Sequence, residues 1–214
     1  MPPEEPLVLG FDTSSEFCTA AIIRGSLTVA SRNEKIGRGH DERLFPLIEA
    51  LLNETGIDWK DLAAIGTGTG PGNFTGTRIS VAAARGLSMS LGIPAVGVSR
   101  FAALRLGISE PVLASVDAGR RQVFLQRAEG SAPCVQHLDE IRCENPPDFV
   151  VGHESKRIAA SLGIKFRKLE IPAAVAIARV AASRMHASPP PPAPIYNGRQ
   201  RDFPPCNARM PLST

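Results

Sequence analysis

The chain has 214 residues, of which 43% are hydrophobic and 21% charged, and its formal net charge is +3. This composition is typical of a globular protein with one large or two small domains, and it excludes a largely disordered chain. The basic residues are scattered, so the charge gives no reason to expect autonomous nucleic-acid binding. No two of the four cysteines lie close together in sequence, which argues against a zinc ribbon or a redox Cys-x-x-Cys site.

The beginning of the chain, residues 1–6, is acidic and lacks the basic start and long apolar core of a signal peptide. No apolar run is long enough to span a membrane. We therefore expect a cytoplasmic protein with no membrane partner.

The first thirty residues predict an antiparallel meander of three strands, at 7–11, 17–23 and 27–31. The first strand ends at Asp12, and Ser14 follows in the turn. A carboxylate and a hydroxyl at this place can face a phosphate or a hydrated metal. The alternative, which the residues alone favour, is that the carboxylate bonds the backbone of its own turn.

An amphipathic helix is predicted between Gly37 and Ile57. Its apolar face consists of Leu44, Leu47, Ile48, Leu51 and Leu52. Pro46 leaves two alternatives. Either the helix starts just before the proline, with Asp41 and Glu42 near its positive end, or the proline bends a longer helix.

A glycine-rich segment, residues 66–78, follows an apolar strand at 62–65 and opens a second helix, with Asn73 or Thr75 as its N-cap. Such a loop leaves backbone N–H groups unpaired, which is how phosphates are often held, and Gly70 and Gly72 are the candidate contacts. No lysine follows the last glycine, so the P-loop pattern is absent. The favoured alternative is a tight connection in a crowded place, and both can hold together.

The second helix carries a narrow stripe of mostly small residues that lets another backbone approach closely, namely Ala82, Ala83, Gly86, Leu87 and Ser90. Arg78 and Arg85 are one heptad apart and therefore lie nearly on one face. They form either a solvated surface or the charged rim of an interface. The residues alone leave open whether the two long helices pack on a sheet or face a partner protein.

A strand at 93–98 is expected to pair in parallel with the one before the glycine loop, and Ser99 caps a helix to about Leu106. Strands at 111–116 and 122–127 then repeat the opening theme, with Asp117 in the connecting turn. This echo indicates two related half-domains, each with an aspartate-bearing turn.

After residue 130 the pattern weakens. It predicts a strand at 149–152, helices at 154–162 and 173–185, and an extended proline-rich tether at 188–194. No His-x-x-x-His pair and no Gly-x-Ser-x-Gly elbow occur, so we predict no metal site and no catalytic residues. The run from His40 to Glu42 is more typical of a helix start than of an acid or base catalyst.

Four blocks together resemble the TsaB (YeaZ) family: Asp12-Thr13-Ser14, residues 40–52, residues 70–78 and residues 116–120. The resemblance is strong over residues 7–128 and thin afterwards. It implies an α/β chain with the actin-like, sugar-kinase-like (ASKHA) fold, in which two subdomains each have a mixed sheet and flanking helices. We expect them at residues 1–107 and, smaller and shortened, at 108–187, with a proline-rich tail at 188–214.

The resemblance also implies a non-catalytic scaffold, without cofactor, in the synthesis of N6-threonylcarbamoyladenosine in tRNA. The two N-terminal helices would pair with the catalytic paralogue TsaD, or with a second copy in its absence. TsaE would join the larger complex, and tRNA would be contacted only through it. The interface residues expected on this basis are Leu44, Leu47, Ile48, Leu51, Arg78, Ala82 and Arg85.

TsaD carries a metal-binding His-x-x-x-His that this chain lacks, so its activity does not transfer. The competing hypothesis is an ATP-dependent kinase or hydrolase that places Asp12, Asp117 and the loop at 70–76 around the phosphates. A fold alone does not decide between these functions.

Overall fold

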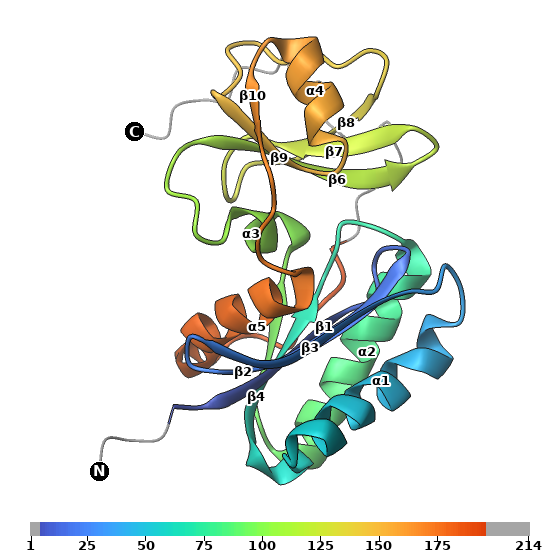
Figure 1. Cartoon of the computed structure of the whole chain (residues 1–214), viewed down its shortest axis with the longest axis vertical. Coiled ribbons are helices and arrows are strands. Elements are labelled where there is room, and N and C mark those ends of the chain that lie inside the picture. Colours follow the sequence, from blue (N-terminus) through green and yellow to red (C-terminus); the bar gives the residue numbers. More distant parts are fainter. Residues whose placement is uncertain (1–4, 196–214) are drawn as a thin grey trace. The chain divides into compact units, whose positions relative to one another are not determined.

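The computed structural model describes residues 5–195 of the chain (Figure 1). These residues divide into two units, one formed by 5–106 together with 170–195 and the other by 107–169. Each unit is built on one five-stranded mixed sheet. The predicted organisation as two α/β subdomains is therefore confirmed.

The sheet of the first unit has the strand order β3-β2-β1-β4-β5. Its strands are β1 (Leu7–Asp12), β2 (Phe17–Arg24), β3 (Leu27–Lys35), β4 (Leu62–Gly68) and β5 (Ala95–Val98). The first three strands pair antiparallel, which confirms the predicted meander. β4 pairs in parallel with β1, and β5 with β4, as expected for strands joined by helical crossovers.

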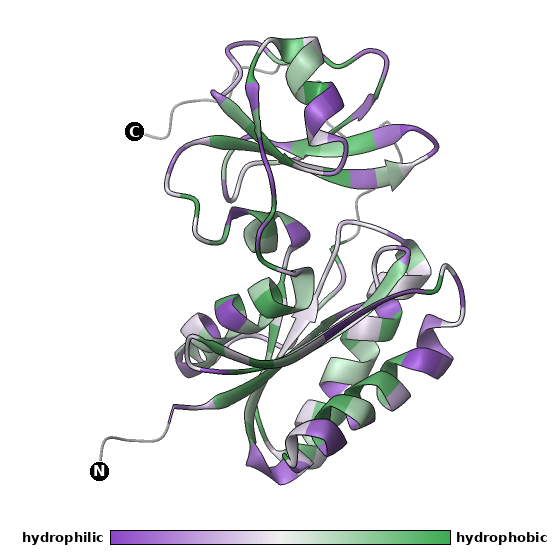
Figure 2. Ribbon diagram, viewed as in Figure 1, coloured by the Kyte–Doolittle hydropathy of each residue, from purple (hydrophilic) through white to green (hydrophobic). Residues whose placement is uncertain are grey.

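Helices cover both faces of this sheet. They are α1 (His40–Thr55), α2 (Phe74–Leu91), α3 (Arg100–Arg105) and α5 (Ala173–Arg184), with short 3₁₀ turns at Trp59–Asp61 and Met185–Ala187. The leucines of α1 share one core cluster with Leu9, Phe11 and Ile65, and side chains of α2 pack on the same cluster. α5 shares the cluster of the opposite face with Val8 and Ala64. α1 begins at His40 and runs through Pro46, with hydrophobic and hydrophilic faces visible in Figure 2.

The sequence placed α5 in the second subdomain, and the structure corrects this. Gly10 and Gly66 are paired on β1 and β4, and α5 crosses them at close range. A Cβ on Gly66 would lie 2.7 Å from the Cβ of Ala181, and one on Gly10 would lie 2.7 Å from the Cβ of Ala178. The alanine-rich face of α5 thus fits the glycine patch of the first sheet, which fixes this helix to the first unit.

The second unit repeats the topology of the first. Its elements are β6 (Val112–Gly119), β7 (Gln122–Gln126), β8 (Cys134–His137), β9 (Phe149–Gly152), α4 (Ser155–Leu162) and β10 (Lys165–Arg167). The strand order β10-β9-β6-β7-β8, reversed, is that of the first sheet: a three-stranded antiparallel meander, then two parallel strands. The echo in the sequence thus corresponds to a repeated supersecondary unit.

The proline-rich segment is more than the predicted tether. Pro192 is buried, and a Cβ on Gly97 would lie 3.3 Å from the Cβ of Pro192. The Ile195 amide donates to the carbonyl oxygen of Thr69 at 2.9 Å. The remainder of the predicted tail, from residue 196 onward, lies outside the described residues. Across the described part of the chain, no helix combines the length and the hydropathy that crossing a membrane requires.

Candidate functional site

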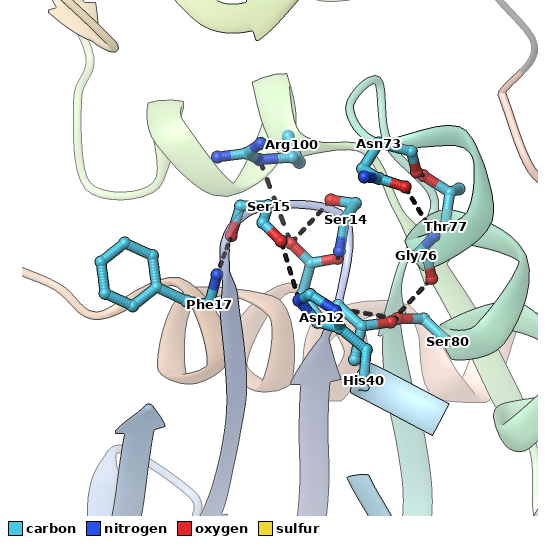
Figure 3. A network of polar contacts seen from close by, with 11 residues as sticks. Asp12, Ser14, Ser15, Phe17, His40, Asn73, Gly76, Thr77, Ser80 and Arg100 are labelled. Atoms are coloured by element: carbon cyan, nitrogen blue, oxygen red, sulfur yellow. Dashed lines mark hydrogen bonds and ion pairs between the residues drawn. The ribbon is translucent and has the colours of Figure 1, made fainter. Parts of the chain in front are cut away.

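A buried polar network joins the turn after β1 to the start of α2 (Figure 3). Asp12, only 2% exposed, lies at its centre. The amide of Ser14 donates to Asp12 Oδ1 and the hydroxyl of Ser14 donates to Oδ2, each at 2.9 Å. Arg100 Nε lies 4.0 Å from Oδ2. The carboxylate is thus bonded to its own turn, which is the alternative that the sequence favoured.

The glycine loop packs directly on that turn. A Cβ on Gly72 would overlap the carbonyl oxygen of Ser14, and a Cβ on Gly76 would overlap that of Thr13. The amide of Asn73 donates to the carbonyl oxygen of Ser14 at 2.7 Å. These glycines are therefore required because two backbone segments meet with no room for a side chain.

Several polar groups at the start of α2 bond within the chain. Asn73, one of the two candidates from the sequence, is the N-cap, and its side chain accepts from the Gly76 amide at 3.0 Å. Ser80 Oγ accepts from the Thr13 amide at 2.9 Å, and the Thr13 hydroxyl donates to the Gly76 carbonyl oxygen at 2.7 Å. At the start of α2 the amide of Asn73 is thus bonded to the β1–β2 turn and the amide of Gly76 to the cap, so neither is left for a phosphate.

His40 and Gly70, both singled out from the sequence, have hydrogen-bond partners within the chain. His40 is 6% exposed, and its Nε2 lies 2.9 Å from the carbonyl oxygen of Ser15. Gly70 has φ of 85°, and its carbonyl oxygen accepts from the Arg100 amide at 2.8 Å. Both groups therefore hold the loops around the Asp12 turn in place.

Asp117 lies in the second unit, at the end of β6, and is half exposed. Its Oδ1 accepts from the Gly119 amide at 2.9 Å and lies 3.7 Å from His153 Nε2. Sequence reasoning did not connect His153 with Asp117. His153 follows β9 and reaches this position because β9 pairs in parallel with β6. Within residues 5–195, no group of three or more His, Cys, Asp or Glu side chains could hold a metal ion.

A shallow groove runs between α1 and α2 and is the second candidate site. Its volume is about 470 Å³, and it is lined by Asp41, Leu44, Phe45, Ile79, Ala82, Ala83, Gly86 and Leu87. The stripe of small residues predicted on α2 thus forms one wall and Phe45, which is 40% exposed, stands on the other.

The structure corrects part of the predicted interface. Leu44, Leu47, Ile48 and Leu51 are at most 1% exposed and pack in the core beneath α1. Leu47, Ile48 and Leu51 thus serve the core of their own unit, whereas Leu44 also lines the groove. Arg78, Ala82 and Arg85 are exposed on α2, so this part of the prediction concerns surface residues.

Sequence reasoning missed the large apolar residues that the two helices turn outward. Phe74 is 58% exposed and Met89 is 87% exposed. The guanidinium of Arg78 stacks 3.8 Å from the centre of the Phe74 ring. The signal available was the helical spacing of Phe74, Arg78, Ala82, Arg85 and Met89, which lie on one side of α2.

Comparison with known proteins gives a consistent set of relatives. A family model described as TsaD: tRNA N6-adenosine threonylcarbamoyltransferase matches residues 29–201. The tRNA threonylcarbamoyladenosine biosynthesis protein TsaB of Escherichia coli (strain K12) is 30% identical over 148 residues, which is 67% of this chain and 64% of that protein. The chain therefore spans less than two thirds of the length of this curated relative.

Two solved structures share the fold. YeaZ from Pseudomonas aeruginosa superposes with a TM-score of 0.68 at 24% identity, over 90% of this chain and 100% of that chain. An uncharacterized protein with similarity to the peptidase YEAZ from Pseudomonas aeruginosa gives a TM-score of 0.71 at 23% identity, over 89% of this chain and 99% of that one.

Proposed function

This chain belongs to the TsaB (YeaZ) family, and we propose that it is an accessory, non-catalytic subunit in the synthesis of N6-threonylcarbamoyladenosine in tRNA. The observation that carries the proposal is the outward face of α1 and α2, where an apolar groove and large exposed side chains lie on a rigid pair of helices. Such a face is typical of a protein–protein interface.

The proposed partner on this face is TsaD, the catalytic paralogue, with a second copy of this chain taking its place when TsaD is absent. TsaE joins the larger complex, and tRNA is contacted only through that complex, in the cytoplasm. The exposed groove, flanked by Arg78 and Arg85, supports this assignment because apolar centres with charged rims favour specific association.

The geometry around Asp12 supports a non-catalytic role. Both carboxylate oxygens accept hydrogen bonds from Ser14, and Gly72 and Gly76 are packed against the same turn. The alternative, an ATP-dependent kinase or hydrolase, needs this carboxylate and this loop to face phosphates. It is not favoured because these groups are engaged with each other.

The experiment that tests the proposal measures complex formation and activity together. Light scattering coupled to size-exclusion chromatography of this chain, alone and with TsaD of the same organism, is expected to give a one-to-one heterodimer. Formation of N6-threonylcarbamoyladenosine by the reconstituted system is expected to require both proteins. Absence of a complex, or saturable ATP turnover by this chain alone, would refute the proposal.

A surface variant tests the face without disturbing the core. Phe45→Asp puts a charge into the groove, where it would be buried without a partner in the complex, so TsaD binding is expected to weaken by about 10-fold or more. Phe166→Asp is the matched control, because Phe166 is 45% exposed and lies in the second unit. Equal effects of the two changes would contradict the placement of the interface on α1 and α2.

A further inference from the structure

The second unit carries a basic and apolar surface at one edge of its sheet, formed by α4, β10 and the residues that follow β10. The segment 155–169 contains five basic side chains and no acidic one. The two large apolar side chains that the described part of this unit exposes lie in the same segment: Phe166 is 45% exposed and Leu169 is 44% exposed. Basic residues are scattered over the chain as a whole, but here they gather around exposed apolar surface.

The arginines of this segment are engaged within the chain, whereas its lysines are not. Arg157 forms an ion pair with Asp139, and Arg167 Nη2 lies 2.7 Å from Glu110 Oε1. Within residues 5–195 no ion pair involves the three lysines, which are all exposed: Lys156, Lys165 and Lys168. Three positive charges therefore remain for a group outside the chain.

Two aromatic rings are interleaved with these cations. The parallel register of β10 and β9 sets Lys165 beside Phe149, and Lys165 Nζ lies 5.9 Å from the centre of the Phe149 ring. Phe166 is the next residue on the strand and points to the opposite face, where Lys156 Nζ of α4 lies 5.5 Å from the centre of its ring. Each face of this edge thus presents a ring with a lysine beside it.

β10 is the last strand of its sheet, as Figure 1 shows, so one side of its backbone has no strand partner among the described residues. The amide of Lys165 donates to the carbonyl oxygen of Asp148 at 2.9 Å. Because successive amides of a strand point in opposite directions, that of Phe166 points away from the sheet. A short edge rich in lysine discourages pairing with another β-strand, whereas the same charges suit a polyanion.

We propose that this surface, the β10 edge, binds single-stranded RNA. It consists of Phe149, Lys156, Lys165, Phe166 and Lys168. The lysines neutralise phosphates, and a base stacks on the exposed ring of Phe166. A stacked base must be free of a duplex, so the ligand is a single-stranded stretch. An anionic lipid surface would meet the same charges, but it would need a wider apolar face than the described part of this unit exposes.

The choice of RNA among polyanions rests on the proposed function, and the inference deepens that function by giving this chain a contact of its own with the tRNA. Three lysines and one stacked base give weak binding, with a dissociation constant of about 10⁻⁵–10⁻⁴ M. The contact therefore matters once the complex already holds the tRNA, because a second contact on a held ligand forms at a high effective concentration.

Fluorescence anisotropy of a labelled oligouridine of about twelve nucleotides, titrated with this chain alone, tests the charges. The logarithm of the association constant is expected to fall with the logarithm of the salt concentration with a slope of about −2, as for three phosphate contacts on a single strand. Lys165→Gln with Lys168→Gln should lower the affinity at 50 mM NaCl by about 10-fold and make the slope shallower by about 1.4.

Arg127→Gln with Arg142→Gln is the matched control, because it removes the same charge from the second unit at a distance from β10. Both arginines are exposed, and they follow β7 and β8 at the other side of the sheet. Affinity and salt slope are expected to stay at the wild-type values in this control.

A second variant tests for stacking on the ring. Phe166→Leu keeps an exposed apolar side chain but removes the flat ring, so the affinity for oligouridine should fall by about 5-fold or more. The same variant should bind an RNA duplex of equal length as the wild type does, because the bases of a duplex are already stacked on one another.

Failure of the wild-type chain to bind oligouridine, an unchanged slope in the double lysine variant, or an unchanged affinity in Phe166→Leu would each overturn the inference. Binding to vesicles that contain phosphatidylserine, without binding to oligouridine, would assign the β10 edge to a lipid surface and overturn it as well. These measurements contain no TsaD. Loss of the TsaD complex with intact RNA binding would therefore count against the proposed function alone, and the reverse result would count against this inference alone.

Discussion

Two glycines of α2 lie in opposite surroundings, one tightly packed and one open. Gly76 lies against the carbonyl oxygen of Thr13, whereas Gly86 faces open space. The first glycine holds the turn after β1 against the helix and so fixes the fold. The second lies where the chain leaves open space, and as a glycine inside a helix it lowers the stability of α2 slightly.

Alanine at each position is expected to change stability in opposite directions. Gly76→Ala should lower the free energy of unfolding by about 1–3 kcal/mol, because the new methyl group forces the Thr13 turn away. Gly86→Ala should raise it by about 0.5–1 kcal/mol through helix propensity. Urea unfolding of the monomeric chain at low concentration measures both, and a loss at Gly86 would show that its surroundings are not open.

The buried thiol of Cys18 is expected to make the fold less stable at alkaline pH. Burial, with a contribution from Glu34, raises the pKa of Cys18 from 9.0 to about 11. The folded state therefore keeps the proton at a pH where the unfolded chain has lost it. The stabilisation is complete below pH 9 and is lost as the pH rises through 11, and it amounts to about 3 kcal/mol.

The pH profile of unfolding tests this assignment. Between pH 9 and 11 the wild type is expected to lose stability more steeply than Cys18→Ala, which is less stable at neutral pH but lacks the thiol. Parallel profiles for the two proteins would mean that Cys18 titrates alike in the folded and unfolded chain.

At the level of elements, the contact between α5 and the first sheet depends on small residues on both sides. Gly66→Ala should destabilise the fold by about 1–3 kcal/mol, because its methyl group would lie 2.7 Å from the Cβ of Ala181. Adding Ala181→Gly should recover part of this loss, although the same change alone costs about 1 kcal/mol of helix propensity. A double-mutant cycle of thermal unfolding measures the coupling, and strictly additive effects would argue against the contact.

Local signals predicted most elements because apolar runs, N-caps and turn residues act within a few residues of one another. Ser99 was recognised as a cap and Asn73 as one of two candidates, and both accept the expected backbone hydrogen bond. The short strands β8 and β10 were missed. β10 contains only Lys165–Arg167, whose two charged residues hide any apolar pattern, and it forms because β9 offers a free edge.

Which elements pack on one another was harder to predict than the elements themselves. The apolar stripe of α1 is the same whether it faces a sheet or another protein, so Leu47 and Leu51 were assigned to an interface although they are buried in the core. Likewise, nothing local to α5 says which sheet it covers. That choice depends on Gly10 and Gly66, which are distant in sequence from the helix. The sequence also left undecided whether Gly70 and Gly72 hold a phosphate, because Ser14, on which Gly72 packs, is distant in sequence.

For the whole molecule, the repeated topology bears on the choice between the proposed binding role and an enzyme. Each unit ends a strand in an aspartate-bearing turn, yet the turn at Asp12 is bonded to Ser14 and covered by the glycine loop. The groups around Asp12 are thus bonded to one another, which supports the proposed non-catalytic role. Of the large apolar side chains exposed on the first unit, Phe45, Phe74 and Met89 lie on α1 and α2.

The charged rim of the α1–α2 face predicts how the proposed complex with TsaD responds to salt. Arg78 and Arg85 are exposed on α2, beside the groove. Exposed ion pairs contribute about 0.2–1 kcal/mol each and are screened as the Debye length shrinks, so two such pairs together should lose about 0.7 kcal/mol between 50 and 500 mM NaCl. The dissociation constant of the complex should therefore rise by about 3-fold over this range. Sedimentation velocity at both salt concentrations measures it, with Arg78→Gln combined with Arg85→Gln as a variant that should respond less to salt. A dissociation constant that falls or stays constant would mean that the groove associates through its apolar surface alone, with the two arginines left in solvent.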